Sequence, residues 1–235
     1  IVLHQDFGTS YNTGRPVLKE ILNVFPNTVT LAASAILIAV VIGVILGIIS
    51  AVKQYSILDN IVMVFALIGT SVPIFWLGIM MIVLCSVKLG WLPPSGYGTF
   101  KQMIMPAVAL GLQSTAVIAR MTRSSMLEVI SQDYVKTARA KGLSTPVIMF
   151  KHALRNACIP VVTSLGPLIA GILTGSFVVE KVFAINGVGK YFVNSITARD
   201  YPVIMGTTIF YAVLLIGCNY LVDLAYGVID PRIKM

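Results

Sequence analysis

Charged residues are scarce in this chain: Asp, Glu, Lys and Arg together make up 11% of its 235 residues. Soluble globular proteins carry about 25% charged residues, whereas 57% of this sequence is apolar and its mean hydropathy is +0.90. The composition therefore excludes an ordinary soluble domain and predicts an integral membrane protein. Acidic residues are the scarcest, at nine against 17 Lys and Arg. No DNA- or RNA-binding motif accompanies this basic excess, so we expect no nucleic acid partner.

Motifs for catalysis and for cofactor binding are also missing. The sequence contains no GxxxxGK[ST] phosphate loop, no HExxH and no GxSxG. Cys85, Cys158 and Cys218 lie in separate apolar runs without metal-ligand spacing, and His4 and His152 stand alone. These absences predict that the chain is not an enzyme and holds no metal or other cofactor. Almost no charge falls inside the apolar runs, which disfavours a proton- or sodium-coupled carrier.

Five apolar runs approach or exceed the roughly 20 residues that a helix needs to cross a bilayer. They span 28–51, 61–87, 104–119, 159–179 and 203–228. The predicted fold class is therefore an all-α polytopic membrane protein with five visible transmembrane helices. Residues 1–27 carry too many charges to span. We expect them to form an extracytoplasmic segment with a short helix on the membrane surface, and 28–235 to form the membrane domain.

Positive charge is densest between the third and fourth runs, where seven Lys or Arg residues fall within 120–155. Cytoplasmic loops of membrane proteins carry an excess of Lys and Arg, so this loop and the C-terminus are predicted to be cytoplasmic. Five spans then leave Ile1 outside. The sequence starts without a methionine, and one more span would return the N-terminus to the cytoplasm. We therefore expect a first transmembrane helix to be missing from this sequence.

Small residues and a proline mark two places inside the apolar runs. Ala39, Gly43 and Gly47 follow a four-residue spacing that lets another helix approach closely, although glycine is also simply tolerated in membrane helices. Pro73, in SVPIFW, removes a backbone donor and predicts a kink in the second run. Such a break lines the pathway in some transporters, and in other proteins it serves packing alone.

Polar side chains inside the third and fourth runs are candidates for a translocation pathway. They are Gln113, Ser114, Thr163 and Thr174. Lipid offers no hydrogen-bonding partner, so such groups face the interior of a bundle or a wet cavity. Hydrogen bonds between helices account for them equally well.

The polar segment of about 133–158 has the pattern of two helices joined by a turn. Asp133–Lys141 is predicted to extend the third span as a helix that Gly142 ends. Thr145 then stands at an N-cap and Pro146 at the first position of a helix that runs to Asn156. The apolar stripe of this second helix consists of Val147, Phe150 and Leu154. Such a helix suits a groove in a cytosolic protein or the surface of anionic membrane lipid, and the residues alone leave both open.

Several blocks of the chain resemble one transporter family. YVKTARAKG and KHALRNACIP are similar to the loop shared by membrane subunits of ATP-binding-cassette (ABC) importers, and more specifically by the dipeptide/oligopeptide/nickel permease family. MTRSSMLEVISQDYVKTARAKG, GSFVVEKVFAINGVGKYFV, RDYPVIMGTT and LVDLAYGVIDPRIK extend the resemblance over most of the chain in the expected order. Lys136, Thr137 and Ala138 replace the general Glu-Ala-Ala, as is usual in this branch. Asn186 stands where proline is common.

The resemblance implies a type I ABC importer transmembrane domain with a cytoplasmic coupling helix. The chain would be the permease subunit of an ATP-driven importer in a bacterial or archaeal cell membrane. Its expected partners are a homologous second permease, two cytosolic ATPases that hold ATP and Mg, and an extracytoplasmic solute-binding protein. The expected cargo is di- or oligopeptides. The alternative cargo is nickel or a metal chelate, and a standalone channel or secondary carrier is the rival of a different class.

The resemblance also implies roles for individual residues. The residues expected to dock the ATPase are Tyr134, Ala138, Gly142, Pro146, Val147, Phe150, His152 and Leu154. The residues expected to face the binding protein are Glu180, Asn186, Gly187, Gly189 and Asp200.

Overall fold

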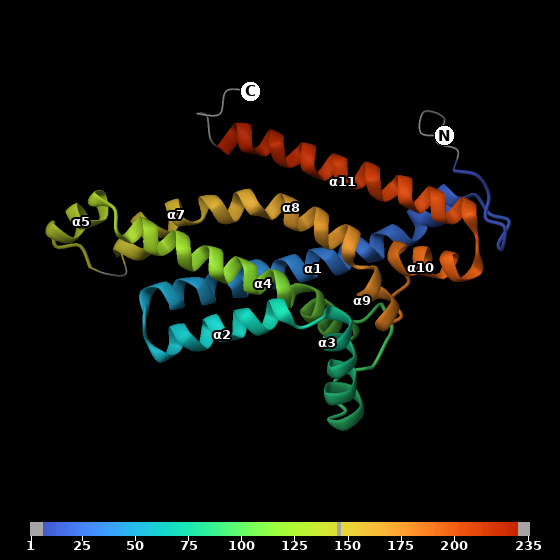
Figure 1. The fold of residues 1–235 in the computed structure, drawn as a ribbon, viewed down its shortest axis with the longest axis horizontal. Helices are drawn as coiled ribbons and strands as arrows, with labels where there is room; N and C mark the ends of the chain where they lie inside the picture. Colours follow the sequence, from blue (N-terminus) through green and yellow to red (C-terminus); the bar gives the residue numbers. More distant parts are fainter. Residues whose placement is uncertain (1–6, 145–146, 230–235) are drawn as a thin grey trace. The chain divides into compact units, whose positions relative to one another are not determined.

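The computed structural model describes residues 7–144 and 147–229, and over this part of the chain the regular structure is helical (Figure 1). The α-helices are α1 (Val17–Val52), α2 (Ile57–Ser71), α3 (Ile74–Met81), α4 (Phe100–Ile130), α5 (Asp133–Ala140), α7 (Leu154–Ala157), α8 (Ile159–Gly175), α9 (Phe177–Val182), α10 (Val188–Ala198) and α11 (Tyr201–Ile229). Two short π-helical segments are η1 (Ile82–Lys88) and η2 (Ile148–Ala153). An isolated β-bridge joins Thr9 to Pro16.

The chain divides into two compact units. The first comprises residues 1–36, 73–110 and 167–235, and the second comprises 37–72 and 111–166. Helices α1, α4 and α8 each contribute residues to both units. The two units are described separately below as the first unit and the second unit.

Helix α1 begins at Val17 and continues for 36 residues without interruption through Pro26. The short helix expected within residues 1–27 is not a separate helix, because the residues from Val17 onward form the start of α1. Membrane helices tolerate proline because neighbouring groups satisfy the backbone that it frees. Here the Thr30 hydroxyl donates to the carbonyl of Pro26 at 2.8 Å.

The break predicted at Pro73 is confirmed. Helix α2 ends at Ser71, Val72 and Pro73 adopt extended conformations, and α3 begins at Ile74. Steric conflict with the proline ring disfavours the helical conformation for the preceding residue. The hydroxyls of Thr70 and Ser71 bond to carbonyls one turn earlier, including Leu67.

The close helix approach predicted at Gly43 and Gly47 is also confirmed, in the second unit. A methyl group added to Gly47 would lie 2.5 Å from Cβ of Thr122 and 2.7 Å from the Ala119 carbonyl oxygen. One added to Gly43 would lie 2.9 Å from Ile118 Cβ. Helices α1 and α4 therefore meet backbone to backbone, which only glycine allows.

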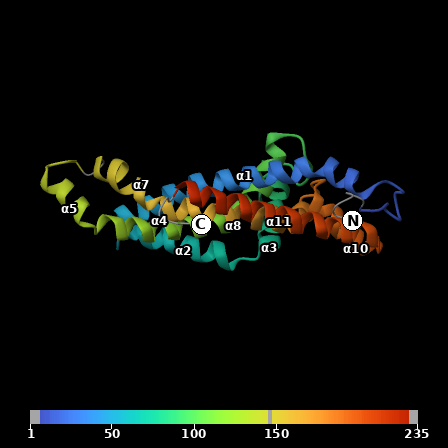
Figure 2. The same cartoon turned by 90° about the horizontal axis from the view of Figure 1, so that it is seen from above.

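A cluster of apolar side chains forms a core in the first unit. It joins the start of α1 to α10 and α11, which lie side by side in both ribbon views (Figures 1 and 2). Its buried members are Val17, Ile21, Val24, Val188 and Val203. This core fixes the N-terminal segment against the helices near the other end of the chain.

Membrane-length helices account for most of the chain. Within the described residues, four stretches are long and apolar enough to cross a bilayer: Val17–Val52, Phe100–Ile130, Leu154–Val182 and Tyr201–Leu221. The broken pair α2 and α3–η1 makes a fifth if its two arms form one span. Five spans were predicted from the apolar runs.

Candidate functional site

The segment predicted to dock an ATPase folds as a closed hairpin in the second unit. Helix α4 ends at Ile130 and α5 starts anew at Asp133, so the expectation that residues 133–141 extend the third span is wrong. Gln132 has an extended backbone, which breaks the helix. Beyond the turn, the chain returns through η2 and α7 rather than through one regular helix.

Two contacts hold the arms of this hairpin together. Val135 and Ala138 of α5 pack against Ile148 of η2, and all three are buried. Nearer the base, the amide of Asn156 donates to the Tyr134 hydroxyl at 2.8 Å. We call residues 133–158 the coupling loop from here on.

The returning arm of the coupling loop rests on the ends of α1 and α4. Met149, Ala153 and Ala157 are buried there against Ala51 and Met126. Small side chains bring the arm close to the helices beneath it, and both ribbon views show α5 and α7 at the same end (Figures 1 and 2). The returning arm therefore packs directly on α1 and α4.

The structure separates the predicted docking residues into three groups. Tyr134, Val147 and Gly142 are exposed, and Gly142 has a left-handed backbone (φ +78°) that favours glycine. Ala138 is buried, and Leu154 is half-buried against the core of the second unit, so both also help to close the loop on itself; their contact with an ATPase stays a prediction. Pro146 lies outside the described residues, and so do the side chains of Phe150 and His152.

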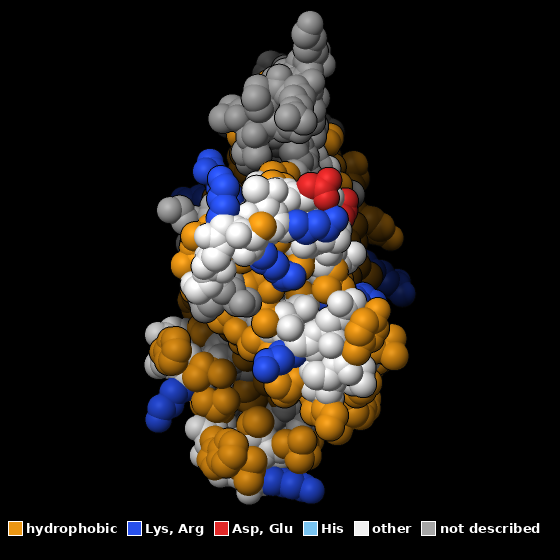
Figure 3. All heavy atoms as spheres, turned by 90° about the vertical axis from the view of Figure 1, so that its left-hand side faces the viewer, with side chains coloured by type: hydrophobic (Ala, Val, Ile, Leu, Met, Phe, Trp, Pro, Cys, Tyr) orange, Lys and Arg blue, Asp and Glu red, His pale blue; other side chains and the backbone are white. Residues whose placement is uncertain are grey.

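Basic side chains gather on this end of the second unit. Figure 3 views the molecule from the side that carries α5 and shows Lys and Arg side chains spread among apolar patches. Lys136 pairs with Asp133 at 2.8 Å, and both side chains are largely exposed. Exposed Tyr134, Leu143 and Val147 supply apolar area between the charges. This mixed surface suits a protein partner with acidic rim residues.

A buried ion pair lies close to the base of the coupling loop. The Arg123 guanidinium binds the Asp59 carboxylate through two nitrogens, at 2.7 and 2.8 Å. The carboxylate also accepts hydrogen bonds from the Ser50 hydroxyl and, at 2.9 Å, from the backbone N–H of Tyr55. Its side chain is only 3% exposed. The cluster ties together α1, the turn before α2, and α4.

The candidate pathway residues occupy different environments. Gln113 is exposed on α4, whereas its neighbour Ser114 is buried. Thr163 and Thr174 are half-buried on α8, and each hydroxyl donates to a carbonyl of its own helix at 2.8 Å. An exposed amide on a membrane-length helix requires a polar neighbour outside the chain or water, so Gln113 is the member that the geometry favours.

Glu180 lies inside the first unit instead of facing outward. Its side chain is fully buried, and its carboxylate accepts hydrogen bonds from Thr28 (2.8 Å) and Ser176 (2.9 Å). A third bond comes from the backbone N–H of Lys190 at 3.0 Å. All the hydrogen-bond partners described for this side chain belong to the chain itself, and its predicted role toward a binding protein stays a prediction.

The two glycines after Glu180 make room for its carboxylate. A methyl group added to Gly189 would lie 2.6 Å from Cβ of Phe177 and 3.0 Å from a Glu180 oxygen, and one added to Gly187 would strike the same carboxylate. Both glycines are buried, and their predicted contact with a binding protein stays a prediction. The segment Gly187–Lys190 opens α10, and a helix N-terminus attracts negative charge. Here Glu180 supplies that charge from within.

Asp200 ties the N-terminal segment to the turn between α10 and α11. It is 2% exposed and accepts bonds from the Ser10 hydroxyl (2.5 Å) and the backbone N–H groups of Tyr11 and Asn12. Burial raises the pKa of Asp200, but these hydrogen bonds outweigh it and hold the pKa below its usual range. Its predicted contact with a binding protein stays a prediction. Asn186 remains exposed, and its carbonyl accepts a bond from Asn27 at 2.7 Å.

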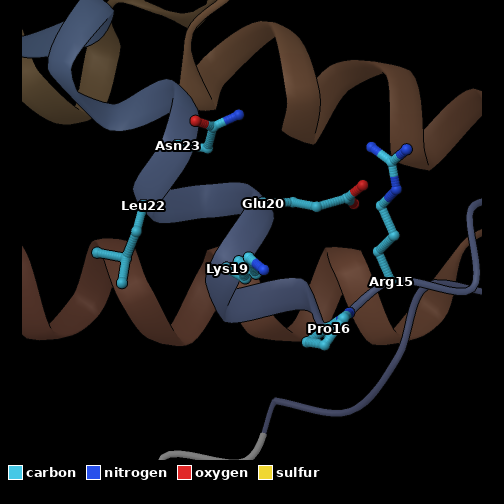
Figure 4. Close-up of a pocket in the computed structure, with 6 residues that line it drawn as sticks. All are labelled: Arg15, Pro16, Lys19, Glu20, Leu22 and Asn23. Atoms are coloured by element: carbon cyan, nitrogen blue, oxygen red, sulfur yellow. The ribbon is translucent and has the colours of Figure 1, made fainter.

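An open hollow of ≈ 560 Å³ lies at the start of α1 (Figure 4). Its lining residues are Arg15, Pro16, Lys19, Glu20, Leu22 and Asn23. Figure 4 shows the side chains of Arg15 and Glu20 extending to the same side of the helix. The mixture of both charges over an open surface suits contact with a polar protein better than capture of a small solute.

Comparison with known proteins identifies the family. Residues 43–235 match the family described as binding-protein-dependent transport system inner membrane component. The chain belongs to this family. It is a multi-pass inner-membrane subunit of a transport system that depends on a binding protein, and a permease subunit of the ABC importer class.

Named relatives are similar over nearly the whole chain. The dipeptide transport system permease protein of Bacillus subtilis (strain 168) is 51% identical over 231 residues, which cover 98% of this chain and 75% of that protein. The dipeptide transport system permease protein of Haemophilus influenzae (strain ATCC 51907 / DSM 11121 / KW20 / Rd) is 42% identical. The alignment covers 99% of this chain and 78% of that protein.

A solved structure supports the fold. The chain resembles the inward-facing MetNI methionine ABC transporter, with a TM-score of 0.73 over 90% of this chain and 96% of that chain, at 19% sequence identity. The predicted type I ABC importer transmembrane domain is therefore confirmed.

Proposed function

We propose that this permease subunit imports di- or oligopeptides, together with a homologous second permease, two cytosolic ATPases and an extracytoplasmic binding protein. The observation that carries the cargo is the 51% identity over 98% of the chain to a dipeptide permease. Exposed Gln113 supports a polar pathway surface on α4 that the second permease completes. ATP and Mg belong to the ATPases in this proposal.

The coupling loop is proposed as the docking element for an ATPase. Its exposed Tyr134, Leu143 and Val147 lie among basic side chains, and its two small cores make it a stiff projection. The stiffness supports a lever role, because a flexible loop would absorb the ATPase movement rather than pass it to α1 and α4.

Loop and C-terminus are proposed to be cytoplasmic, and residues 1–27 extracytoplasmic. On this placement, exposed Asn186 and the hollow at the start of α1 form the surface that the binding protein meets. Asn186 is exposed and the hollow is open, whereas Glu180 and Asp200 are buried.

Uptake of a labelled dipeptide by proteoliposomes that hold the complete importer tests the function. Uptake must require ATP inside and the binding protein outside, and an excess of Ni²⁺ must leave it unchanged. ATP-driven Ni²⁺ uptake without peptide uptake would reverse the choice of cargo. Uptake without any ATPase would support a channel or carrier instead.

Two substitutions of Gly142 test the docking role. A side chain at this residue meets no atom of the chain within 4 Å, but φ is +78°. Gly142→Ala therefore adds only backbone strain of about 1 kcal/mol, and Gly142→Trp adds bulk toward the proposed ATPase. We expect normal membrane insertion of both, near-normal uptake for Ala and loss of ATPase binding for Trp. Equal ATPase binding by the two variants would contradict the docking role.

The orientation is tested with a membrane-impermeant thiol reagent on a variant whose native cysteines are replaced by alanine. Asn186→Cys is expected to react in intact spheroplasts, and Val147→Cys only after lysis. Both residues are exposed in the chain, so a difference between them reports the side of the membrane.

A further inference from the structure

The buried pair Asp59–Arg123 lies beside the core that supports the coupling loop. Ser50, which donates to Asp59, directly precedes Ala51, and Arg123 lies three residues before Met126 on α4. Ala51 and Met126 are the residues on which the returning arm of the loop rests. The ion pair and the loop contact are thus about one helical turn apart on α4.

The pair fixes the orientation of its helices as well as their distance. A guanidinium that binds a carboxylate through two parallel bonds constrains both planes. Removing one partner of such a pair leaves the other charge largely buried without its counter-charge. The turn before α2 is held in addition by the Tyr55 N–H bond to Asp59 and by the Ser56 hydroxyl, which accepts a bond from the Asp59 N–H at 3.3 Å.

Three helical elements therefore share one joint. Gly43 and Gly47 allow α1 to pack closely against α4. Further toward the C-terminus of α4, the ion pair holds the α1–α2 turn to α4. A force applied at Ala51 and Met126 then acts on α1, the α1–α2 turn and α4 together, because the three are held to one another. Without the pair, the same force would tilt α4 and leave the α1–α2 turn behind.

We propose that Asp59 and Arg123 are positioning residues for energy coupling. They make the ends of α1, α2 and α4 one rigid base, so that movement of the coupling loop by the ATPases displaces the three helices together. This inference rests on the proposed function of the chain as a permease driven by ATPases. The pair touches no cargo and no nucleotide in this role.

A purely structural role makes a different prediction. In that case, substitutions of the pair reduce the amount of assembled importer, but every complex that assembles transports normally per ATP hydrolysed. The ratio of peptide imported to ATP hydrolysed therefore separates the two roles, because it does not depend on the amount of complex.

The test uses the complete importer in proteoliposomes, with dipeptide uptake and ATP hydrolysis measured on the same sample. For Asp59→Asn, we expect assembled complexes that hydrolyse ATP, with uptake per ATP reduced by about fivefold or more, the lower range of ordinary coupling between sites. For Arg123→Lys, which keeps the charge but lacks the two-nitrogen fork, we expect a smaller fall of about twofold to threefold in the same ratio.

Glu128→Gln is the matched control. It neutralises an exposed carboxylate on α4 outside the coupling loop, and it is expected to leave the ratio unchanged. Wild-type uptake per ATP in assembled Asp59→Asn complexes overturns the inference. If Asp59→Asn does not assemble, a wild-type ratio for Arg123→Lys overturns it. Failure of the unsubstituted importer to take up peptide refutes the proposed function instead.

Discussion

Two buried carboxylates in this chain are stabilised in opposite ways. Asp59, in the second unit, faces a guanidinium that cancels its charge. Glu180, in the first unit, accepts hydrogen bonds from two hydroxyls and from a backbone N–H at the N-terminus of α10. Without the Asp59 carboxylate, the Arg123 charge stays largely buried and unpaired. Without the Glu180 carboxylate, only neutral hydrogen-bond donors remain. Burial alone therefore does not tell how costly a substitution is.

Asp59→Asn should cause the largest loss of stability. The variant leaves Arg123 without its carboxylate, at a cost of about 3–4 kcal/mol, the lower part of the range for buried pairs because the Arg123 side chain is 23% exposed. The midpoint temperature of unfolding of the detergent-solubilised protein is the measurement. A loss no greater than that of Glu180→Gln would break the contrast between the two carboxylates.

Gly189→Ala should come next, at about 3 kcal/mol, since overpacking a rigid site typically costs 1–3 kcal/mol. The new methyl group meets Phe177 as well as Glu180, so neither side can yield easily. Gly171→Ala is the control, because a methyl group there meets nothing within 4 Å. Equal midpoint temperatures of unfolding for Gly189→Ala and Gly171→Ala would show that the surroundings of Glu180 have room for the added methyl group.

Glu180→Gln should cost about 2 kcal/mol, within the range for hydrogen bonds to charged groups. The amide keeps the shape and one acceptor oxygen but turns an NH₂ toward a donor and loses the attraction of the α10 N-terminus. Thermal unfolding of this variant beside Asp59→Asn ranks the two carboxylates directly. A neutral result would mean that the negative charge of Glu180 contributes nothing.

Asp200 offers a pH test of a third carboxylate. Because its folded pKa lies below its usual value, its stabilisation is complete above the unfolded pKa of about 3.9 and disappears as pH falls through the folded value. The difference in unfolding midpoint between wild type and Asp200→Asn should stay constant from about pH 7 to 5 and shrink below about pH 4. A difference that grows on acidification would have the wrong sign.

Lys136→Gln should have the smallest effect. It removes an exposed ion pair with Asp133, and such pairs contribute about 0–1 kcal/mol. Unfolding midpoints in low and high salt measure it, and both are expected to match the wild type. A loss comparable to that of Asp59→Asn would show that exposure is the wrong criterion for ranking these pairs.

Local features of the fold were predictable from the sequence. Pro73 breaks the helix through its own ring, and Gly43 and Gly47 mark a close approach through their spacing along one helix. Each of these effects arises within a few residues, where chemistry and chain geometry suffice. The five apolar runs were readable for the same reason.

The buried networks were not predictable. Glu180 lies in a polar stretch between apolar runs and was expected to face outward. The hydroxyl that donates to its carboxylate belongs to Thr28, 152 residues earlier. Asp59 and Arg123 are 64 residues apart, with no repeating pattern that relates them. The isolation of Asp59 at the start of an apolar run was a signal, because a charge there needs a partner. Only the folded structure shows which residue that partner is.

The crossing of α1 and α4 at Gly43 and Gly47 has a mechanical consequence. Side chains that interlock can change rotamer and let two helices slide by small amounts, but at this crossing the contact atoms belong largely to the backbone and to Cβ of the facing helix. Rotamer changes therefore cannot let these two helices slide past each other. The two helices stay together or separate at this crossing, so the contact at Gly43 and Gly47 resists sliding of α4 along α1.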